Sequence, residues 1–405
     1  MHLRKRYVAA SALAASLMLV GACAPTQGAD SETTEGAGAE TGAEVQPIDV
    51  GVVYSRTGPL AGYGEQYLAA FEAGLDYATD GTNIAGDYEI NLEIVDDAGD
   101  PNKAVNAFKD MVGTGIPLIV GTASSGVALQ VAPLAEQNQT VYIVGPAAVD
   151  QVTGINGYTF RSGRQTYQDV ATAGTFLDDV EGASVAVFAQ DNAFGQGNAA
   201  TVEAVLGGAG ATVTPILVGE SVTEFTGEAQ KILDAQPDLL FVAWAGETTA
   251  AMWQALEQQG VMEATTVVTG LADTASYQAY GPASDRINFL NHYFAGAADN
   301  EVNTAMIDGI EAAGGVPDLF SPDGFNAALM VVRAIEEGGD DPDAMVAALE
   351  GWTFAGPKGE MTIRAADHAM IQPMFQVRLV DDGGTWVPEL IQAIAGDEVA
   401  PPEAG

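Results

Sequence analysis

Side chains able to carry catalysis are few in this sequence. Histidine occurs only at positions 2, 292 and 368, and the chain has one cysteine. The HExxH, CxxC and Gly-x-Ser-x-Gly patterns of zinc, redox and hydrolase sites are absent. A serine hydrolase could still use Ser125 and His368, provided that the fold brings the two side chains within hydrogen-bonding distance. We expect binding without catalysis and retain the hydrolase as a remote alternative.

Paired acidic residues suggest a second chemistry, the binding of metal ions. Asp96-Asp97 and Asp340-Asp341 are examples. Neither pair has the spacing of a calcium-binding loop. We interpret both as solvated turns, and we predict no metal ion and no cofactor.

The stretch from Asp49 to Tyr77 contains an informative loop. β-Branched residues at its start predict a buried strand, a glycine-rich segment (58–64) interrupts the strand, and apolar residues at steps of three and four then predict a helix. Open α/β sheets bind ligands at such loops, at the carboxyl ends of strands. The loop lacks the spacing of a nucleotide-binding motif. Tyr63, the aromatic residue within it, is therefore a candidate contact for a small molecule.

Strand and helix patterns alternate along the rest of the chain. Further strands are predicted at 88–95, 117–121, 141–148, 158–163, 184–191, 211–218, 239–244, 265–270 and 287–294. This alternation indicates an α/β fold with parallel sheets covered by helices on both faces. The strands are too many for one small sheet, so we predict two Rossmann-like lobes, with an eight-stranded barrel as the rival.

The composition limits the partners of the protein. The 405 residues include 14 Lys and Arg against 55 Asp and Glu, which gives a formal net charge of −41. Such a surface repels nucleic acid and anionic membranes. We interpret the excess of acidic residues as a source of solubility, and adaptation to high salt is a second hypothesis.

Both ends of the chain are predicted to lie outside the fold. Residues 1–22 have a basic start and an apolar core, which predict a secretory signal peptide too short for a confident membrane span. The sequence VGAC (20–23) resembles the lipobox of bacterial lipoproteins, and this resemblance implies that Cys23 is lipidated. Residues 23–46 predict a flexible tether, and residues 393–405 a disordered tail.

Several loops, taken in order, resemble those of the branched-chain amino acid (Leu/Ile/Val-type) solute-binding proteins of bacterial ABC importers. The matching stretches are GPLAGYG (58–64), DDAGDP (96–101), GTASS (121–125), GPAA (145–148), FR (160–161), DNAFG (191–195), ADH (366–368) and QP (372–373). Each stretch is short, and their order and spacing over about residues 47–390 carry the resemblance. It implies the type I periplasmic-binding-protein fold, with two lobes, parallel central sheets and three hinge crossovers.

The resemblance also implies how the chain is divided. Lobe 1 is expected from residues 47–163 plus 297–362, and lobe 2 from residues 164–296 plus 363–392. The hinge is expected near residues 161–164, 295–297 and 362–364. Ligand binding would close the lobes about this hinge and bias an open–closed equilibrium.

Candidate ligand contacts follow from the same resemblance. Ser124 and Ser125, with the backbone of Ala147 and Ala148, match the loops that hold a ligand's carboxylate, and the serines are equally suited to cap a helix. Tyr63 and Phe194 match aromatic residues that cover the ligand from opposite lobes, and Trp244 would replace the family's aromatic residue after the 239–243 strand. Asp273 is the candidate partner of the ligand's ammonium, and Tyr167 is a candidate pocket residue.

One position departs from the Leu/Ile/Val-binding pattern. The family has a threonine after Pro-Ala-Ala whose hydroxyl takes the ligand's ammonium, and here the residue is Val149. A valine side chain cannot accept a hydrogen bond. The ligand is then an amino acid held by other groups, or a solute without an α-amine, such as an amide or an aromatic acid.

The implied function is the capture of a small amphipathic solute, without catalysis, for delivery to an ABC permease and its ATPase subunits. The implied location is extracytoplasmic, with the protein lipid-anchored to the outer face of the bacterial cell membrane or periplasmic. We do not expect nucleic acid as a partner. We expect a monomer. A ligand sensor of the same fold is the alternative to a transport component.

Overall fold

The computed structural model describes residues 45–177 and 179–404. The predicted signal peptide, the predicted lipidation site Cys23 and nearly all of the predicted tether lie outside the described residues. Strand β1 (Gln46–Tyr54) begins at Gln46, which is the last residue of the predicted tether. No helix within the described ranges combines the length and the apolar character of a membrane span.

Lobe 1 is built on a six-stranded sheet with the order β2-β3-β1-β4-β5-β6. Neighbouring strands run parallel, except that β2 pairs antiparallel with β3. The further bounds are β2 Ile84–Ala85, β3 Tyr88–Asp96, β4 Leu118–Val120, β5 Val141–Val144 and β6 Thr159–Arg161. Strands β4 and β5 are buried along their whole length, which explains their unbroken apolar sequences.

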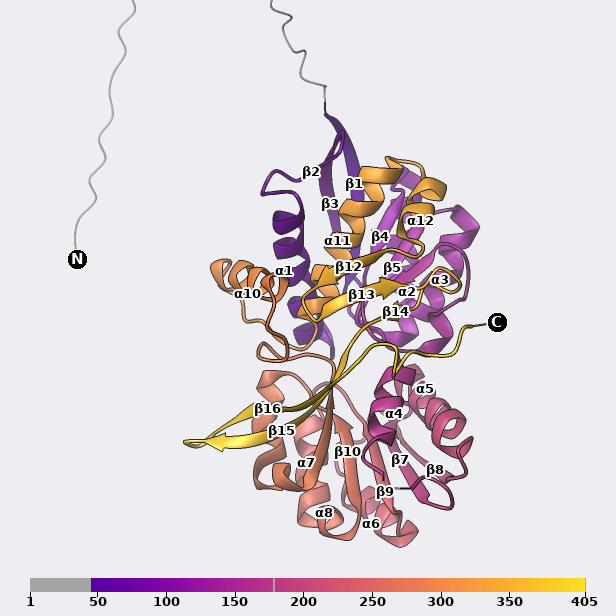
Figure 1. Ribbon diagram of the computed structural model, residues 1–405. Coiled ribbons are helices and arrows are strands. Elements are labelled where there is room, and N and C mark those ends of the chain that lie inside the picture. The colour runs from indigo at the N-terminus through magenta and orange to yellow at the C-terminus, as the bar shows by residue number, and fades with distance from the viewer. Residues whose placement is uncertain (1–44, 178, 405) are drawn as a thin grey trace, which may run out of the picture. The chain divides into compact units, whose positions relative to one another are not determined.

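Helices from both halves of the sequence cover lobe 1. They are α1 Ala61–Ala78, α2 Pro101–Thr114, α3 Ser125–Asn138, α10 Glu301–Ala312, α11 Ser321–Gly338 and α12 Pro342–Leu349. In Figure 1 the orange helices α10 to α12 lie beside the indigo and magenta elements, although more than a hundred residues separate them in the sequence. Lobe 1 is therefore discontinuous in sequence.

A small antiparallel sheet completes lobe 1. It has the order β12-β13-β14 and contains β12 Thr353–Gly356, β13 Gly359–Ile363 and β14 Met370–Ile371. Phe354, Met361, Ile363 and Met370 pack into the same core as the strands of the large sheet of lobe 1.

Lobe 2 is built on a seven-stranded sheet with the order β16-β15-β11-β10-β9-β7-β8. The strands are β7 Ser184–Gln190, β8 Thr212–Val218, β9 Leu239–Ala243, β10 Thr266–Gly270, β11 Ile287–Asn291, β15 Met374–Asp382 and β16 Thr385–Ile394. Strands β7 to β11 pair in parallel, and β15 and β16 add an antiparallel edge. The helices are α4 Thr166–Gly174, α5 Ala193–Val202, α6 Thr226–Ala235, α7 Thr249–Gln258, α8 Val261–Ala264 and α9 Tyr277–Tyr280.

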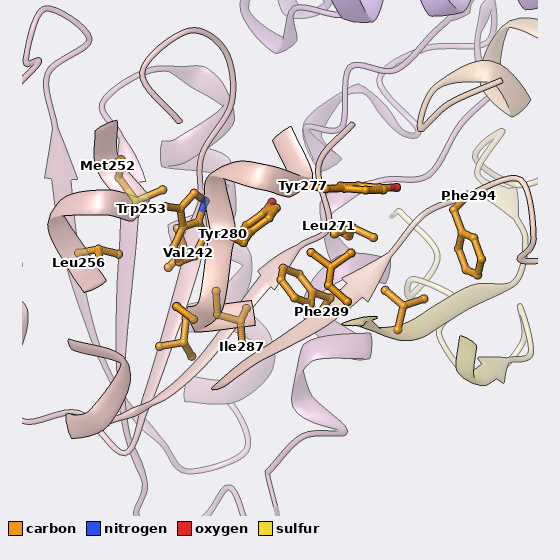
Figure 2. Close-up of a cluster of buried hydrophobic side chains, with 14 of the residues drawn as sticks. Val242, Met252, Trp253, Leu256, Leu271, Tyr277, Tyr280, Ile287, Phe289 and Phe294 are labelled. Carbon is orange, nitrogen blue, oxygen red and sulfur yellow. The ribbon is translucent and has the colours of Figure 1, made fainter. Parts of the chain in front are cut away.

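The core of lobe 2 is rich in aromatic residues. Figure 2 shows Trp253, Tyr280 and Phe289 among aliphatic side chains from the strands and from α7. The rings of Tyr280 and Phe289 meet edge to face with their centroids 4.8 Å apart. Each buried aromatic side chain removes roughly 150–250 Å² of surface from water, so this cluster is a main source of the stability of the lobe.

The prediction of an α/β fold with two lobes and parallel central sheets is confirmed. The third crossover differs from the prediction at 362–364. Strand β14 still pairs with β13 of lobe 1, and β15 is the next strand to join the sheet of lobe 2, so the chain crosses at Gln372-Pro373. The sequence pattern missed this because β14 has only two residues.

The prediction of a disordered tail at residues 393–405 is also wrong for the residues that the structure describes. Strand β16 continues to Ile394, and Val399 is buried against Met374. The carbonyl of Pro401 accepts a hydrogen bond from Arg364 at 2.6 Å. A buried valine and backbone hydrogen bonds thus join to the fold a segment whose composition alone predicts disorder.

Candidate functional site

A cavity of about 340 Å³ lies between the two lobes. The carboxyl ends of the parallel strands of lobe 2 line it, together with loops that follow the strands of both sheets. Its volume is at the small end of the range for ligand pockets, roughly 300–1,000 Å³. Its position agrees with the rule that open α/β sheets bind ligands at the carboxyl ends of their strands.

One end of the cavity is suited to an anion. Ser124 caps α3 by accepting a hydrogen bond from the Val127 N–H at 3.4 Å, and Ser125 and Gly126 line the cavity in the first turn. The first N–H groups of a helix have no partner within the helix, and the helix dipole places partial positive charge there. A carboxylate is the natural ligand of such an end.

Arg161 fixes the loop beside this end. It is fully buried, and its Nε donates to the Thr153 hydroxyl at 2.6 Å, while its Nη1 donates to the Ala147 carbonyl at 2.8 Å. Its Nη2 donates to the Val149 carbonyl. Burial lowers the pKa of Arg161 to about 10, so the side chain remains charged at neutral pH. These hydrogen bonds hold the backbone of residues 147–153 in one position.

A second arginine, Arg164, reaches the cavity itself. Its Nε lies 3.3 Å from Asp169 Oδ2, and its Nη1 donates to the Pro146 carbonyl at 3.1 Å. Both Arg164 and Asp169 line the cavity. Burial raises the pKa of the Asp169 carboxyl, and the charge of Arg164 opposes that rise.

His292 lines the cavity at the end of β11 and is buried. Its Nε2 lies 2.8 Å from Asp323 Oδ1, on the first turn of α11 in lobe 1. Burial lowers the pKa of His292 to about 4, which the Asp323 carboxylate only partly offsets. His292 is therefore neutral near pH 7. Lys358 lies nearby and donates a hydrogen bond to Gln372 at 2.9 Å, and burial lowers the pKa of Lys358 to about 7.

Aromatic side chains form much of the remaining wall. The rings of Tyr63 and Phe320 meet edge to face with their centroids 4.8 Å apart. Trp244 stacks on Phe188 at 5.1 Å, and its indole N–H donates to Thr248 at 2.9 Å. Gly246 in lobe 2 lies close to Pro59 in lobe 1, since a Cβ atom on Gly246 would lie 3.1 Å from the Pro59 carbonyl oxygen. The two lobes thus meet at this wall.

Comparison with known proteins decides the family. The model of a periplasmic binding protein family matches residues 47–385. The chain belongs to this periplasmic binding protein family. A relative from Brucella melitensis named Leu/Ile/Val-binding protein homolog 3 is 26% identical over 348 residues, which are 83% of this chain and 92% of the relative.

Solved structures agree with this assignment. An ABC-type branched-chain amino acid transporter from Rhodopseudomonas palustris is 30% identical and superposes with a TM-score of 0.73, covering 88% of this chain and 99% of the other. A solute-binding protein of an R. palustris ABC transporter, in complex with 4-hydroxybenzoate, is 20% identical with a TM-score of 0.79, covering 86% and 97%. At that identity the second structure shows the shared fold alone.

Six of the nine ligand contacts predicted for this periplasmic binding protein line the cavity. They are Tyr63, Ser124, Ser125, Ala148, Phe194 and Trp244. The structure brings these residues together from both lobes, and their contact with a ligand stays a prediction.

The other three predicted contacts do not line the cavity. Ala147 packs in the core of lobe 1, in the cluster that also holds Val149. Tyr167 lies on the first turn of α4, where its backbone N–H donates to Asp150. Asp273 accepts a hydrogen bond from the Ser276 hydroxyl at 2.6 Å, so its carboxylate serves a local turn. The role of Asp273 as the partner of a ligand's ammonium stays a prediction.

Arg164, Asp169 and His292 line the cavity but were not predicted as contacts. None belongs to a motif. Arg164 and Asp169 lie at or just after the first crossover between the lobes, and His292 lies shortly before the second. The sequence could have indicated Arg164, because only 14 Lys and Arg occur in this acidic chain and Arg164 lies at a predicted hinge.

The hydrolase alternative requires His368 to meet Ser125. Instead, the Nδ1 of His368 lies 3.0 Å from the Thr159 carbonyl, and its Nε2 lies 3.2 Å from Glu350. Its ring stacks on Phe160 with centroids 3.8 Å apart. Both ring nitrogens thus have partners other than Ser125, and His368 is not among the residues that line the cavity.

The interpretation of Asp96-Asp97 as a solvated turn is wrong for Asp97. Its buried carboxylate accepts hydrogen bonds from the Ser55 hydroxyl at 2.7 Å and from the Thr122 hydroxyl at 2.5 Å. Asp97 therefore ties together the loops that follow β1 and β4. Among the described residues, no group of three or more His, Cys, Asp or Glu could hold a metal ion.

Proposed function

We propose that this periplasmic binding protein is the solute-binding component of an ABC importer and captures a small amphipathic solute between its lobes. The observation that carries the proposal is the cavity, which combines the start of α3 and Arg164 with an aromatic and aliphatic wall. A ligand with a carboxylate at one end and an apolar body matches both parts.

Amino acids with apolar side chains are the ligands that we favour. The relative from B. melitensis carries the name Leu/Ile/Val-binding protein homolog, and another relative, from Pseudomonas aeruginosa, is named for binding leucine, isoleucine, valine, threonine and alanine. Aromatic acids are the second candidate. Tyr63, Phe194, Trp244 and Phe320 line the cavity, and a structural neighbour was solved with 4-hydroxybenzoate.

We further propose that the mature protein is extracytoplasmic, anchored through lipidated Cys23, and works as a monomer with a permease. The position of the single cysteine directly after an apolar leader supports the anchor. A Cys23→Ser protein that stayed in the membrane fraction would contradict it. Neighbouring genes for permease and ATPase subunits would favour transport over sensing.

A thermal-shift panel tests the proposed function. The panel contains leucine, isoleucine, valine, their amides, benzoate and 4-hydroxybenzoate. A ligand at 100 times its dissociation constant stabilises the folded state by about 2.7 kcal/mol. We expect at least one member to raise the melting temperature. The absence of any shift up to millimolar concentrations would count against a solute of this class.

A further inference from the structure

Arg164 and Asp169 form a buried ion pair on the wall of the cavity. The exposed fraction is 9% for Arg164 and 6% for Asp169. Arg164 belongs to the first crossover, and Asp169 follows on the first turns of α4. Burying two charges is costly, and a hydrophobic pair of similar volume is often at least as stable. A buried pair that opens into a ligand cavity is therefore better explained by binding than by stability.

Both members of the pair keep unused hydrogen-bonding capacity. A guanidinium has five donors, and a carboxylate has about four acceptor sites. Arg164 uses Nε on Asp169 and Nη1 on Pro146, and its Nη2 has no partner recorded within the described ranges. The Asp169 carboxylate accepts a hydrogen bond from Arg164 and has no other hydrogen-bond partner recorded among the described residues. A ligand in the cavity can add contacts to each.

Val149 stands at the position where the Leu/Ile/Val-binding pattern has a threonine that binds the ligand's ammonium. The Val149 side chain packs in the core of lobe 1, and its carbonyl already accepts from Arg161. Of the described residues that line the cavity, two are acidic, Asp169 and Glu220. Glu220 is exposed and accepts a hydrogen bond from Asn192. Asp169 is thus the buried carboxylate available to a cationic group.

We propose that Arg164 and Asp169 together receive the zwitterionic head of an α-amino acid. Arg164, with the N–H groups at the start of α3, binds the ligand's carboxylate, and Asp169 accepts hydrogen bonds from its ammonium. The four charges then alternate in sign, so each contact reinforces the next. The apolar wall near Trp244 and Leu271 is left for the side chain. This inference rests on the proposed function and narrows its ligand to amino acids.

Titration calorimetry with matched ligands tests the assignment. The probes are L-leucine, 4-methylpentanoate, which lacks the ammonium, 3-methylbutylamine, which lacks the carboxylate, and 4-hydroxybenzoate. Hydrogen bonds to charged groups contribute enough that losing either group should weaken binding roughly 10- to 100-fold. We therefore expect the wild-type protein to bind leucine most tightly of the four.

Three variants separate the two roles. Asp169→Asn should weaken leucine binding roughly 10- to 100-fold and should not weaken 4-methylpentanoate binding, because that ligand has no ammonium. Arg164→Gln should weaken both ligands. Asp367→Asn is the matched control, since it removes the carboxylate of another arginine pair, Arg364–Asp367 at 2.6 Å, away from the cavity; it should leave both affinities unchanged.

Folding is checked by thermal unfolding, and the double variant Arg164→Gln/Asp169→Asn avoids leaving one charge unpaired in the interior. The double variant should lose the preference for leucine over 4-methylpentanoate. The assignment is overturned if Asp169→Asn weakens both ligands equally or leaves leucine binding intact. It is also overturned if the wild-type protein prefers 4-methylpentanoate or 4-hydroxybenzoate, a result that leaves the importer function standing. A wild-type protein that binds none of the probes overturns both.

Discussion

His292 illustrates how burial sets the charge state of a residue at this cavity. The ring is buried, and the groups facing it are Asp323 from α11, Lys358 from the turn between β12 and β13, and Arg164 from the first crossover. Burial and the two cations lower the pKa of His292 to about 4, while Asp323 acts in the opposite direction. The neutral ring can therefore contact a ligand without adding charge.

Acid should destabilise the protein partly through His292. The unfolded chain protonates this histidine below about pH 6.5, and the folded chain does so only below about pH 4. The unfolded state thus binds more protons in that interval, so stability falls as the pH drops, by up to about 3 kcal/mol from this group. Urea unfolding at pH 7 and pH 4.5 should show a smaller loss for His292→Asn than for the wild type. Equal losses would contradict the assignment.

At the scale of single residues, the sequence located the cavity-lining residues that lie in glycine-rich loops. Tyr63 and Ser125 follow strands whose apolar runs are visible in the sequence, so their loops could be placed at the carboxyl edge of a sheet. Arg164 and Asp169 could not be assigned in this way. Their role depends on how the two lobes pack, and no local pattern encodes that arrangement.

At the scale of elements, tight turns between strands and helices bring the helix starts to the cavity. A Cβ atom on Gly195 would lie 1.8 Å from the Gln190 carbonyl oxygen, and one on Gly64 would lie 2.0 Å from that of Ser55. Only glycine allows such close approach. The sequence predicted these loops because glycines interrupt strong strand patterns. It missed β2, β12 and β14, which are very short, and β16, whose residues are mostly exposed.

The C-terminal segment provides a prediction at this scale. Residues 395–404 leave β16 of lobe 2, bury Val399, and reach Arg364 and Asp367, which precede β14 of lobe 1. Deleting residues 397–405 should lower the free energy of unfolding by roughly 1–3 kcal/mol, because a buried valine and several hydrogen bonds are lost.

Urea unfolding measures this loss. Val399→Ala should reproduce part of it, whereas Glu398→Ala, at an exposed neighbour, should change stability by less than about 0.5 kcal/mol. A truncated protein as stable as the full chain would show that the segment contributes nothing.

At the scale of the whole molecule, the alternation of strands and helices, together with the number of strands, favoured two α/β lobes over a barrel. The point of the third crossover was not predictable, because a two-residue strand decides it. The net charge of −41 is a property that no single element determines. Repulsion among so many like charges destabilises the compact state unless salt screens it.

Salt should therefore stabilise the protein. The screening length falls from about 10 Å at 0.1 M salt to about 3 Å at 1 M. We expect the melting temperature to rise by roughly 5 °C or more between 20 mM and 1 M NaCl, as screening weakens the repulsion. Differential scanning calorimetry provides the measurement. A melting temperature that is constant or falls over this range would show that the acidic surface serves solubility alone.

The central claim is that the cavity between the lobes is the solute site, and calorimetric titration of a blocked variant tests it most directly. Ala193 lines the cavity at the start of α5, close to Gly126 of α3. Ala193→Trp should fill the space between the two helix starts and abolish the heat of binding of the best ligand from the panel. Gln196→Trp, at an exposed position of the same helix, should bind like the wild type. Unchanged binding by a folded Ala193→Trp protein would contradict the account.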